Sequence, residues 1–247
     1  MSGSWKIVNE VINDADVLML VLDSRLVDET RNVQIEQRVK GLGKPLIYVL
    51  SKCDLVGKDV AEKWKRTLNP SVFVSSKNHQ GTTLLRERIM IEGKRAFPGK
   101  NSFKVGVLGY PNVGKSSLIN AIRGKNVAPT SILSGHTRHV QKIKADNRII
   151  LLDTPGVIPI NEKDYVKHAL IGTIDFNHEK DPDMIVMWLM EKFPGRIESF
   201  YGIEVCEDKE ETIRKFAVKR KMIAKGGEPD IARVSRMILE DWQRGRI

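Results

Sequence analysis

The chain has 247 residues, of which 41% are hydrophobic and 29% are charged. This composition is typical of a globular protein in water, and the length suits one α/β domain with a smaller appendage. The longest wholly apolar run, residues 17–22, is too short to cross a membrane, and no charged-then-apolar signal pattern opens the sequence. We therefore expect neither a membrane protein nor a secreted one.

The sequence contains two cysteines, Cys53 and Cys206. Two thiols are too few for a four-thiolate zinc site, and a structural disulfide is not expected. The simplest compartment for such a chain is a reducing cytoplasm.

Basic residues outnumber acidic ones by 41 to 31, which gives a net charge of +10. Residues 1–175 hold the whole excess, with 27 basic and 17 acidic side chains, whereas residues 176–247 hold 14 of each. A basic protein favours polyanions such as RNA. A solvated, lysine-rich surface explains the same composition equally well.

Short β-rich runs alternate with amphipathic stretches such as residues 34–42 and 84–91. Strand–helix alternation predicts a mostly parallel, six-stranded sheet covered on both faces, hence an α/β fold. Alternating polarity makes the run at 139–144 an edge strand. The runs predicted as strands are 17–22, 46–50, 72–74, 105–108, 139–144 and 149–152.

The character of the sequence changes after about Asp175, where strand signals fade. Residues 184–193, 209–224 and 231–242 have helical periodicity, and a clear break, Gly-Gly-Glu-Pro, lies at 226–229. We expect one domain over residues 1–175 and a small all-α domain over residues 176–247. A segment with Pro98 and Gly99, residues 97–101, is predicted as a linker within the first domain.

Residues 109–116 read G-Y-P-N-V-G-K-S, between a predicted strand and a helix-like segment. This is the G-x-x-x-x-G-K-[ST] phosphate-loop pattern in its required context. Gly114 lets the backbone approach the phosphates, Lys115 reaches the β- and γ-phosphates, and the Ser116 hydroxyl is a ligand for Mg²⁺. The residues expected to contact a nucleotide here are Pro111, Asn112, Val113, Gly114, Lys115, Ser116 and Ser117.

D-T-P-G at residues 153–156 ends the predicted strand before it. An aspartate at a strand end beside a phosphate loop holds Mg²⁺, and the Gly156 amide is suited to sense a γ-phosphate. Alone, this tetrapeptide is more often an ordinary turn. Thr137 is the favoured switch threonine because it directly precedes the edge strand, with Thr130 as the alternative. The predicted Mg²⁺ ligands are Ser116, Thr137 and Asp153.

Two motifs for base recognition follow the strands at 46–50 and 72–74. Ser51-Lys52-Cys53-Asp54 resembles the N-K-x-D guanine motif, whose carboxylate matches the N1 and N2 donors that adenine lacks. The Lys52 stem is expected to lie against the base plane. Serine in place of the usual asparagine predicts weaker bracing of the neighbouring loops with preserved specificity. Ser75-Ser76-Lys77 resembles the S-A-K motif, although alone it is typical of a turn.

The order of these motifs is unusual, because both base motifs precede the phosphate loop. In ordinary GTPases the phosphate loop, the switch threonine and D-x-x-G come first, and the two base motifs follow them. A compact domain tolerates such a circular permutation when its natural termini are close. Asp54 favours GTP over the rival interpretation, an ATPase or kinase with the same loop.

The chain resembles the circularly permuted GTPases of the YlqF/YawG family, which assist assembly of the large ribosomal subunit. The segment A-D-V-L-M-L-V-L-D-S-R at 15–25 is similar to the family's opening segment, and A-K-G-G-E-P-D at 224–230, followed by Arg233, is similar to its C-terminal signature. The resemblance implies a GTPase that binds GTP and GDP and has the large subunit or its rRNA as partner. Separately, we expect the chain to be a monomer. A histidine near the N-terminus of bacterial relatives, proposed to act in catalysis, has no counterpart, since the first histidine here is His79.

The residue after D-T-P-G is Val157, followed by Ile158, and neither can orient a water as the glutamine of Ras-like proteins does. We therefore predict slow intrinsic hydrolysis, accelerated when a partner orders the switches. Asn112 matches the asparagine of potassium-activated GTPases, so K⁺ is a candidate cofactor beside Mg²⁺; a local turn explains Asn112 equally well. The predicted catalytic residues are Lys115, Thr137 and Asn112.

Residues 214–225, in and just after the predicted helix at 209–224, hold six basic residues with no acidic residue between them. Ile213, Phe216, Ala217 and Ile223 are expected to face a core, which leaves a basic stripe outward. A solvated helix face is the plainer interpretation, but the family resemblance favours RNA phosphates. A second functional class therefore stays open, an RNA-binding module that uses GTP with negligible turnover. The RNA-binding candidates are Arg214, Lys215, Lys219, Arg220, Lys221 and Lys225.

Overall fold

The computed structural model describes residues 3–124, 140–159 and 162–247. The chain divides into two compact units, Met1–Lys163 and Asp164–Ile247. The expected boundary after residue 175 lies later than this division. Helix α7 (Tyr165–Leu170) packs on α8 (Pro182–Lys192) and α11 (Ile231–Gln243), which groups it with the helical unit.

The first unit contains a six-stranded sheet in the order β3-β2-β1-β4-β6-β5. All neighbours are parallel except β5, which runs antiparallel to β6 at the edge. The mostly parallel six-stranded sheet predicted from the sequence is confirmed. The strands are β1 (Val17–Asp23), β2 (Leu46–Ser51), β3 (Ser71–Val74), β4 (Phe103–Gly109), β5 (Gln141–Lys144) and β6 (Ile149–Asp153).

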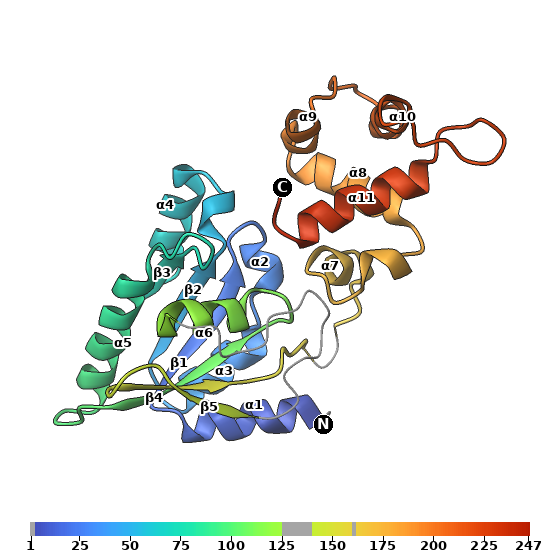
Figure 1. Cartoon of the computed structure of the whole chain (residues 1–247). Helices are drawn as coiled ribbons and strands as arrows, with labels where there is room; N and C mark the ends of the chain where they lie inside the picture. Colours follow the sequence, from blue (N-terminus) through green and yellow to red (C-terminus); the bar gives the residue numbers. More distant parts are fainter. Residues whose placement is uncertain (1–2, 125–139, 160–161) are drawn as a thin grey trace. The chain divides into compact units, whose positions relative to one another are not determined.

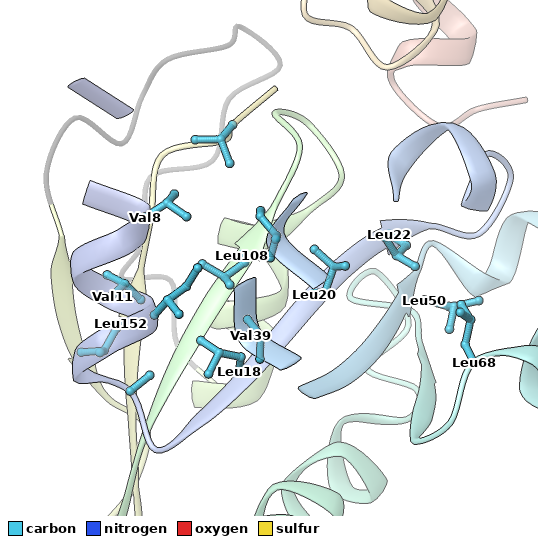
Figure 2. Close-up of a cluster of buried hydrophobic side chains, with 14 of the residues drawn as sticks. Val8, Val11, Leu18, Leu20, Leu22, Val39, Leu50, Leu68, Leu108 and Leu152 are labelled. Carbon is cyan, nitrogen blue, oxygen red and sulfur yellow. The ribbon is translucent and has the colours of Figure 1, made fainter. Parts of the chain in front are cut away.

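Helices cover both faces of this sheet (Figure 1). β1 is buried along its whole length, so its side chains serve two cores in alternation. Leu18, Leu20 and Leu22 lie in one cluster with residues of α1, α3 and α4, and Figure 2 shows part of this cluster. On the opposite face lie α5 and α6. The helices are α1 (Gly3–Asp14), α2 (Val27–Thr30), α3 (Val33–Gly41), α4 (Lys58–Thr67), α5 (Thr82–Ala96) and α6 (Lys115–Arg123).

The second unit is helical throughout its regular elements. Its core is formed by fully buried side chains of α8, α10 (Lys209–Lys219) and α11, including Leu189, Phe216 and Trp242. A further short helix, α9 (Arg196–Tyr201), was not expected from the sequence. Within the described parts of the chain, no helix is both long and apolar enough to span a membrane.

The helix expected over residues 209–224 is shorter than predicted, because α10 ends at Lys219. Lys221 adopts a left-handed backbone with φ of 54°, and the amide of Met222 donates back to the carbonyl of Ala217, which closes the helix end. Ile223 then bridges to Pro229 across an exposed loop. The expectation that Ile223 faces a core is therefore wrong: it is 45% exposed.

Candidate guanine-nucleotide site

The phosphate loop connects the end of β4 to the start of α6. Gly114, directly before α6, has φ of 98°, a backbone conformation that residues other than glycine rarely adopt. At Gly109, a Cβ atom would lie 2.5 Å from the carbonyl oxygen of Val21, so the close packing of β4 against β1 requires glycine there. Asn112 also lies in the left-handed region, with φ of 59°. Asparagine tolerates this backbone well, so the local-turn interpretation of Asn112 has direct support.

Lys115 begins α6 and is buried. Its Nζ donates to the carbonyl oxygens of Tyr110, at 2.5 Å, and Gly109, at 3.2 Å. These contacts fold the lysine back over the loop, where phosphates bind in P-loop proteins. Burial lowers the pKa of Lys115 to about 8, and the nearby Asp153 carboxylate partly opposes that shift.

D-T-P-G lies beside the phosphate loop, as expected from parallel pairing of β4 and β6. Asp153 ends β6 opposite Val107 in the register, and its side chain is buried. The Thr154 hydroxyl donates to the Val107 carbonyl at 2.6 Å. A Cβ atom on Gly156 would lie 2.5 Å from Pro111 backbone atoms, so this glycine permits the closest approach of the segment to the phosphate loop.

The base motif starts at Ser51, the last residue of β2. Its hydroxyl oxygen lies 2.9 Å from the carbonyl oxygen of Leu22 and 2.5 Å from that of Val113 in the phosphate loop. A serine therefore still joins the base motif to the phosphate loop, which modifies the expectation of weaker bracing. Lys52 follows in a left-handed conformation, and Cys53 and Asp54 lie in the short 3₁₀ helix Cys53–Leu55. Asp54 is exposed.

Ser75-Ser76-Lys77 forms a tight turn after β3. Backbone hydrogen bonds join Ser75 and Gln80 in both directions, and the Ser75 hydroxyl accepts from the amide of Asn78 at 3.2 Å. Ser76 is half-buried and Lys77 exposed. Thr137 and the alternative Thr130 lie outside the described residues.

The carboxyl ends of β3, β2, β4 and β6 bring the predicted base, phosphate and magnesium residues to one edge of the sheet. Ser116 and Ser117 lie in the first turn of α6. The Ser116 hydroxyl and the Asp153 carboxylate offer hard oxygen ligands of the kind Mg²⁺ prefers, so the donor set fits that ion. In open α/β sheets, ligands generally bind at the carboxyl ends of the parallel strands.

Sequence reasoning missed a buried charged group at this edge, formed by Asp23 at the end of β1, Arg25 in the turn after it, and Lys52. The available signal was an aspartate at a strand end next to both nucleotide strands. It also missed two contacts to the segment after D-T-P-G. The Trp5 indole donates to the Ile158 carbonyl at 2.8 Å, and the Tyr110 hydroxyl lies 2.6 Å from a Glu162 carboxylate oxygen.

The six RNA-binding candidates do not form one helical stripe. Arg214 lies within ion-pair distance of Glu210, Glu211 and Glu228. The Arg220 guanidinium lies over the Tyr201 and Phe216 rings. The Nζ of Lys215 is 3.2 Å from the Cys206 sulfur, and that of Lys219 donates to the carbonyl of Gly202. Lys221 and Lys225 lie exposed on the loop between α10 and α11.

The fold and this arrangement are those of the P-loop GTP-binding proteins, with the base motifs placed before the phosphate loop. The family model described as "50S ribosome-binding GTPase" matches residues 104–224. Its order of motifs is similar to that of the circularly permuted GTP-binding proteins of the YlqF/YawG family.

Relatives of the chain are GTP-binding proteins. An uncharacterized GTP-binding protein of Methanocaldococcus jannaschii is 40% identical over 98% of this chain and 65% of its own length. Nucleolar GTP-binding protein 2 of Saccharomyces cerevisiae is 34% identical over 98% of this chain and 52% of its own length. The chain thus spans roughly half to two thirds of these relatives.

The fold of the chain is also found in a solved structure. GNP-bound YlqF from T. maritima is similar with a TM-score of 0.65 and 21% identity, over 98% of this chain and 94% of that one. The expected fold, a permuted GTPase sheet with appended helices, is therefore confirmed.

Proposed function

We propose that the chain hydrolyses GTP and acts as a nucleotide-controlled assembly factor for the large ribosomal subunit. The observation that carries this proposal is the meeting of base motif and phosphate loop at one sheet edge, joined by the Ser51 hydroxyl and the Val113 carbonyl. The family description "50S ribosome-binding GTPase" supports the ribosomal partner. Asp54 would read guanine, and Lys115 with the loop amides would neutralise the phosphates.

Mg²⁺ would be held by Ser116 and Asp153, with Thr137 as the third protein ligand. The ion supplies neutralisation of charge on the β- and γ-phosphates. In the hydrolytic step a water oxygen bonds to the γ-phosphorus while the bond from that phosphorus to the β–γ bridging oxygen breaks. The products are GDP, inorganic phosphate and a proton.

Slow intrinsic hydrolysis is the first expected property. Val157, at the position of the water-orienting glutamine, is 2% exposed, and its amide donates to the carbonyl of Gly109 at 3.2 Å. An apolar side chain packed in the core does not orient a water. The purified chain should therefore turn over GTP more slowly than about 1 s⁻¹, near the low end of ordinary enzymes.

The corresponding measurement is multiple-turnover phosphate release, with the chain alone and with large-subunit particles. We expect the particles to raise the rate, with intact 70S or 80S ribosomes and naked rRNA as separate comparisons. A rate above about 1 s⁻¹ for the chain alone would contradict slow intrinsic hydrolysis. No stimulation by any particle would instead favour the alternative function, an RNA-binding module that uses GTP as a ligand with negligible turnover.

Potassium activation is the second expected property, proposed from Asn112. A monovalent cation held there would neutralise charge as an arginine finger does. Hydrolysis is expected to be several-fold faster in KCl than in NaCl at equal ionic strength, and Asn112→Asp should alter that ratio. Equal rates in the two salts would leave Asn112 with its turn role alone.

RNA binding by the helical unit is proposed from Lys221 and Lys225. Both lie on the exposed loop that follows α10, and the aromatic and ion-pair contacts described above engage Arg220 and Arg214. Exposed lysine side chains bind RNA phosphates, and such contacts position the RNA without reading its sequence. The remaining candidates, Lys215 and Lys219, would contribute to the same positive surface.

A salt titration tests this surface. For the wild-type chain, the logarithm of rRNA affinity is expected to fall linearly with the logarithm of salt concentration, by about 0.7–0.9 per phosphate contact. Replacing Lys221 and Lys225 with Gln should reduce the magnitude of this slope by the amount expected for about two phosphate contacts. Lys180→Gln, an exposed lysine outside the candidate set, is the control. A slope unchanged by the double substitution would remove this loop from the RNA interface.

The cytoplasmic location and the monomeric state stay predictions from the sequence. The name of the Saccharomyces relative refers to the nucleolus of that organism. Fractionation of the source cell and light scattering of the purified chain would test the two predictions separately.

A further inference from the structure

A buried ion-pair group lies between the base motif and the turn that follows β1. Asp23 is the last residue of β1, and it pairs in register with Ser51, the last residue of β2. Its Oδ2 atom lies 2.7 Å from Lys52 Nζ and 2.9 Å from Arg25 Nη2. Its Oδ1 atom accepts from the side-chain Nε of Arg25, at 3.1 Å, and from the backbone amide of Arg25, at 3.0 Å.

The side chains of this ion-pair group differ in their exposure to solvent, which distinguishes a buried pair from a partly accessible lysine. The side chains of Arg25 and Asp23 are 1% and 6% exposed, whereas that of Lys52 is 24% exposed. Arg25 and Asp23 thus form a fixed inner pair. Lys52 contacts this pair through its ammonium and keeps part of its stem accessible. An ammonium fixed at one end leaves the four-carbon stem few conformations.

The turn that holds the inner pair is also fixed to the base motif through the backbone. The Ser24 amide and hydroxyl both donate to the carbonyl oxygen of Ser51, at 3.0 and 2.5 Å. The backbone amide of Asp23 lies 3.1 Å from the hydroxyl of Thr30. The carboxylate that contacts Lys52 is therefore placed by the same strand ends that place Ser51 and the phosphate loop.

Attraction between the opposite charges opposes the cost of burying Asp23 and Lys52. Burial alone would raise the pKa of Asp23, but Arg25 and Lys52 together hold it below its ordinary value. Burial lowers the pKa of Lys52, and Asp23 opposes that shift. One carboxylate shared by two cations leaves a net positive charge beside the base motif.

We propose that Asp23, held by Arg25, is a positioning residue that orients Lys52 for stacking on the guanine base. This inference rests on the proposed nucleotide site and goes beyond it, because it assigns a role to the turn after β1. Asp23 would act through Lys52 and contact neither the base nor the phosphates.

A double-mutant cycle for GTP binding tests the proposal. Asp23→Asn alone would leave two cations buried without a carboxylate, and such a variant risks misfolding. The combined Asp23→Asn/Arg25→Gln variant removes one charge of each sign and so keeps the net charge. We expect it to lower GTP and GDP affinity about tenfold, the size of one charge-assisted hydrogen bond. In a Lys52→Ala background the same pair of substitutions should have no further effect.

Two controls separate failure of this inference from failure of the nucleotide site. Asp28→Asn, an exposed carboxylate on α2, should leave affinity unchanged. If Lys52→Ala lowers affinity but the Asp23/Arg25 variant does not, the positioning role is wrong and the base site stands. An equal loss in both backgrounds would show a structural effect that does not pass through Lys52, which also overturns the inference. If Lys52→Ala itself has no effect, the base assignment fails.

Discussion

Lys115→Met is expected to lower GTP affinity at least about 100-fold and to abolish measurable hydrolysis. A charge-assisted hydrogen bond contributes about 1.5–3 kcal/mol, and Lys115 is placed over the loop that would hold the β- and γ-phosphates. Methionine keeps the length of the side chain and suits a buried site. Equilibrium binding with a fluorescent GTP analogue measures the effect, with Lys142→Met on the exposed edge strand as control.

Comparing the pH dependence of the wild type with that of Lys115→Met provides a second, independent measurement. The pKa of Lys115 falls from 10.5 to about 8 on folding, so the unfolded chain binds more protons between these values. Stability conferred by this group is therefore lowest below pH 8 and rises as pH increases from 8 to 10.5, by up to about 3 kcal/mol. Phosphate binding restores the proton, so GTP affinity of the wild type should weaken above pH 8.

Neither pH trend should appear in Lys115→Met. Denaturant unfolding of both proteins at pH 7 and pH 10 gives the stability difference, since every other lysine titrates alike in the two chains. GTP affinity of wild type that stayed constant from pH 7 to pH 9.5 would contradict a buried Lys115 with a lowered pKa.

Asp54→Asn is expected to weaken GTP binding about 100-fold and to shift preference toward xanthosine triphosphate. The carboxylate is the group that matches the paired donors on guanine, and losing a charged hydrogen-bond partner costs about 1.5–3 kcal/mol. Xanthine carries a carbonyl where guanine carries its amino group, which an amide side chain can meet as donor. Competition among GTP, XTP and ATP for the same site provides the measurement.

The control for this specificity change is Asp59→Asn, an exposed aspartate in the first turn of α4. It should leave all three affinities unchanged. If Asp54→Asn kept the wild-type order of preference, guanine recognition would have to come from other residues. ATP binding as tight as GTP binding in the wild type would restore the rival ATPase or kinase function.

The strands and the phosphate loop were predictable because their signals are local. β1 is a continuous apolar run. The phosphate loop has Gly109 where β4 packs closely against β1 and Gly114 where the backbone is left-handed. Their order along the chain predicted the permutation. The end of α10 was missed because a lysine, Lys221, takes the left-handed position where glycine is the usual signal.

The connections within the site were not predictable, because they join residues far apart in the sequence. The hydroxyl of Ser51 and the carbonyl of Val113 are 62 residues apart, and the Trp5 indole and the Ile158 carbonyl are 153 apart. Such contacts depend on which strands become neighbours. The sequence contains the partners of these bonds but no local pattern that pairs them.

The position of β1 in the sheet has a consequence for synthesis of the chain. β1 lies between β2, which follows it closely, and β4, whose last residue, Gly109, is made 86 residues after Asp23. A ribosome adding about 5–20 residues per second needs on the order of ten seconds to reach that point. Until then the apolar strand Val17–Asp23 has one unpaired edge, the kind of surface that recruits chaperones or aggregates. The permuted order of motifs in this chain therefore also sets how long that strand edge stays exposed during synthesis.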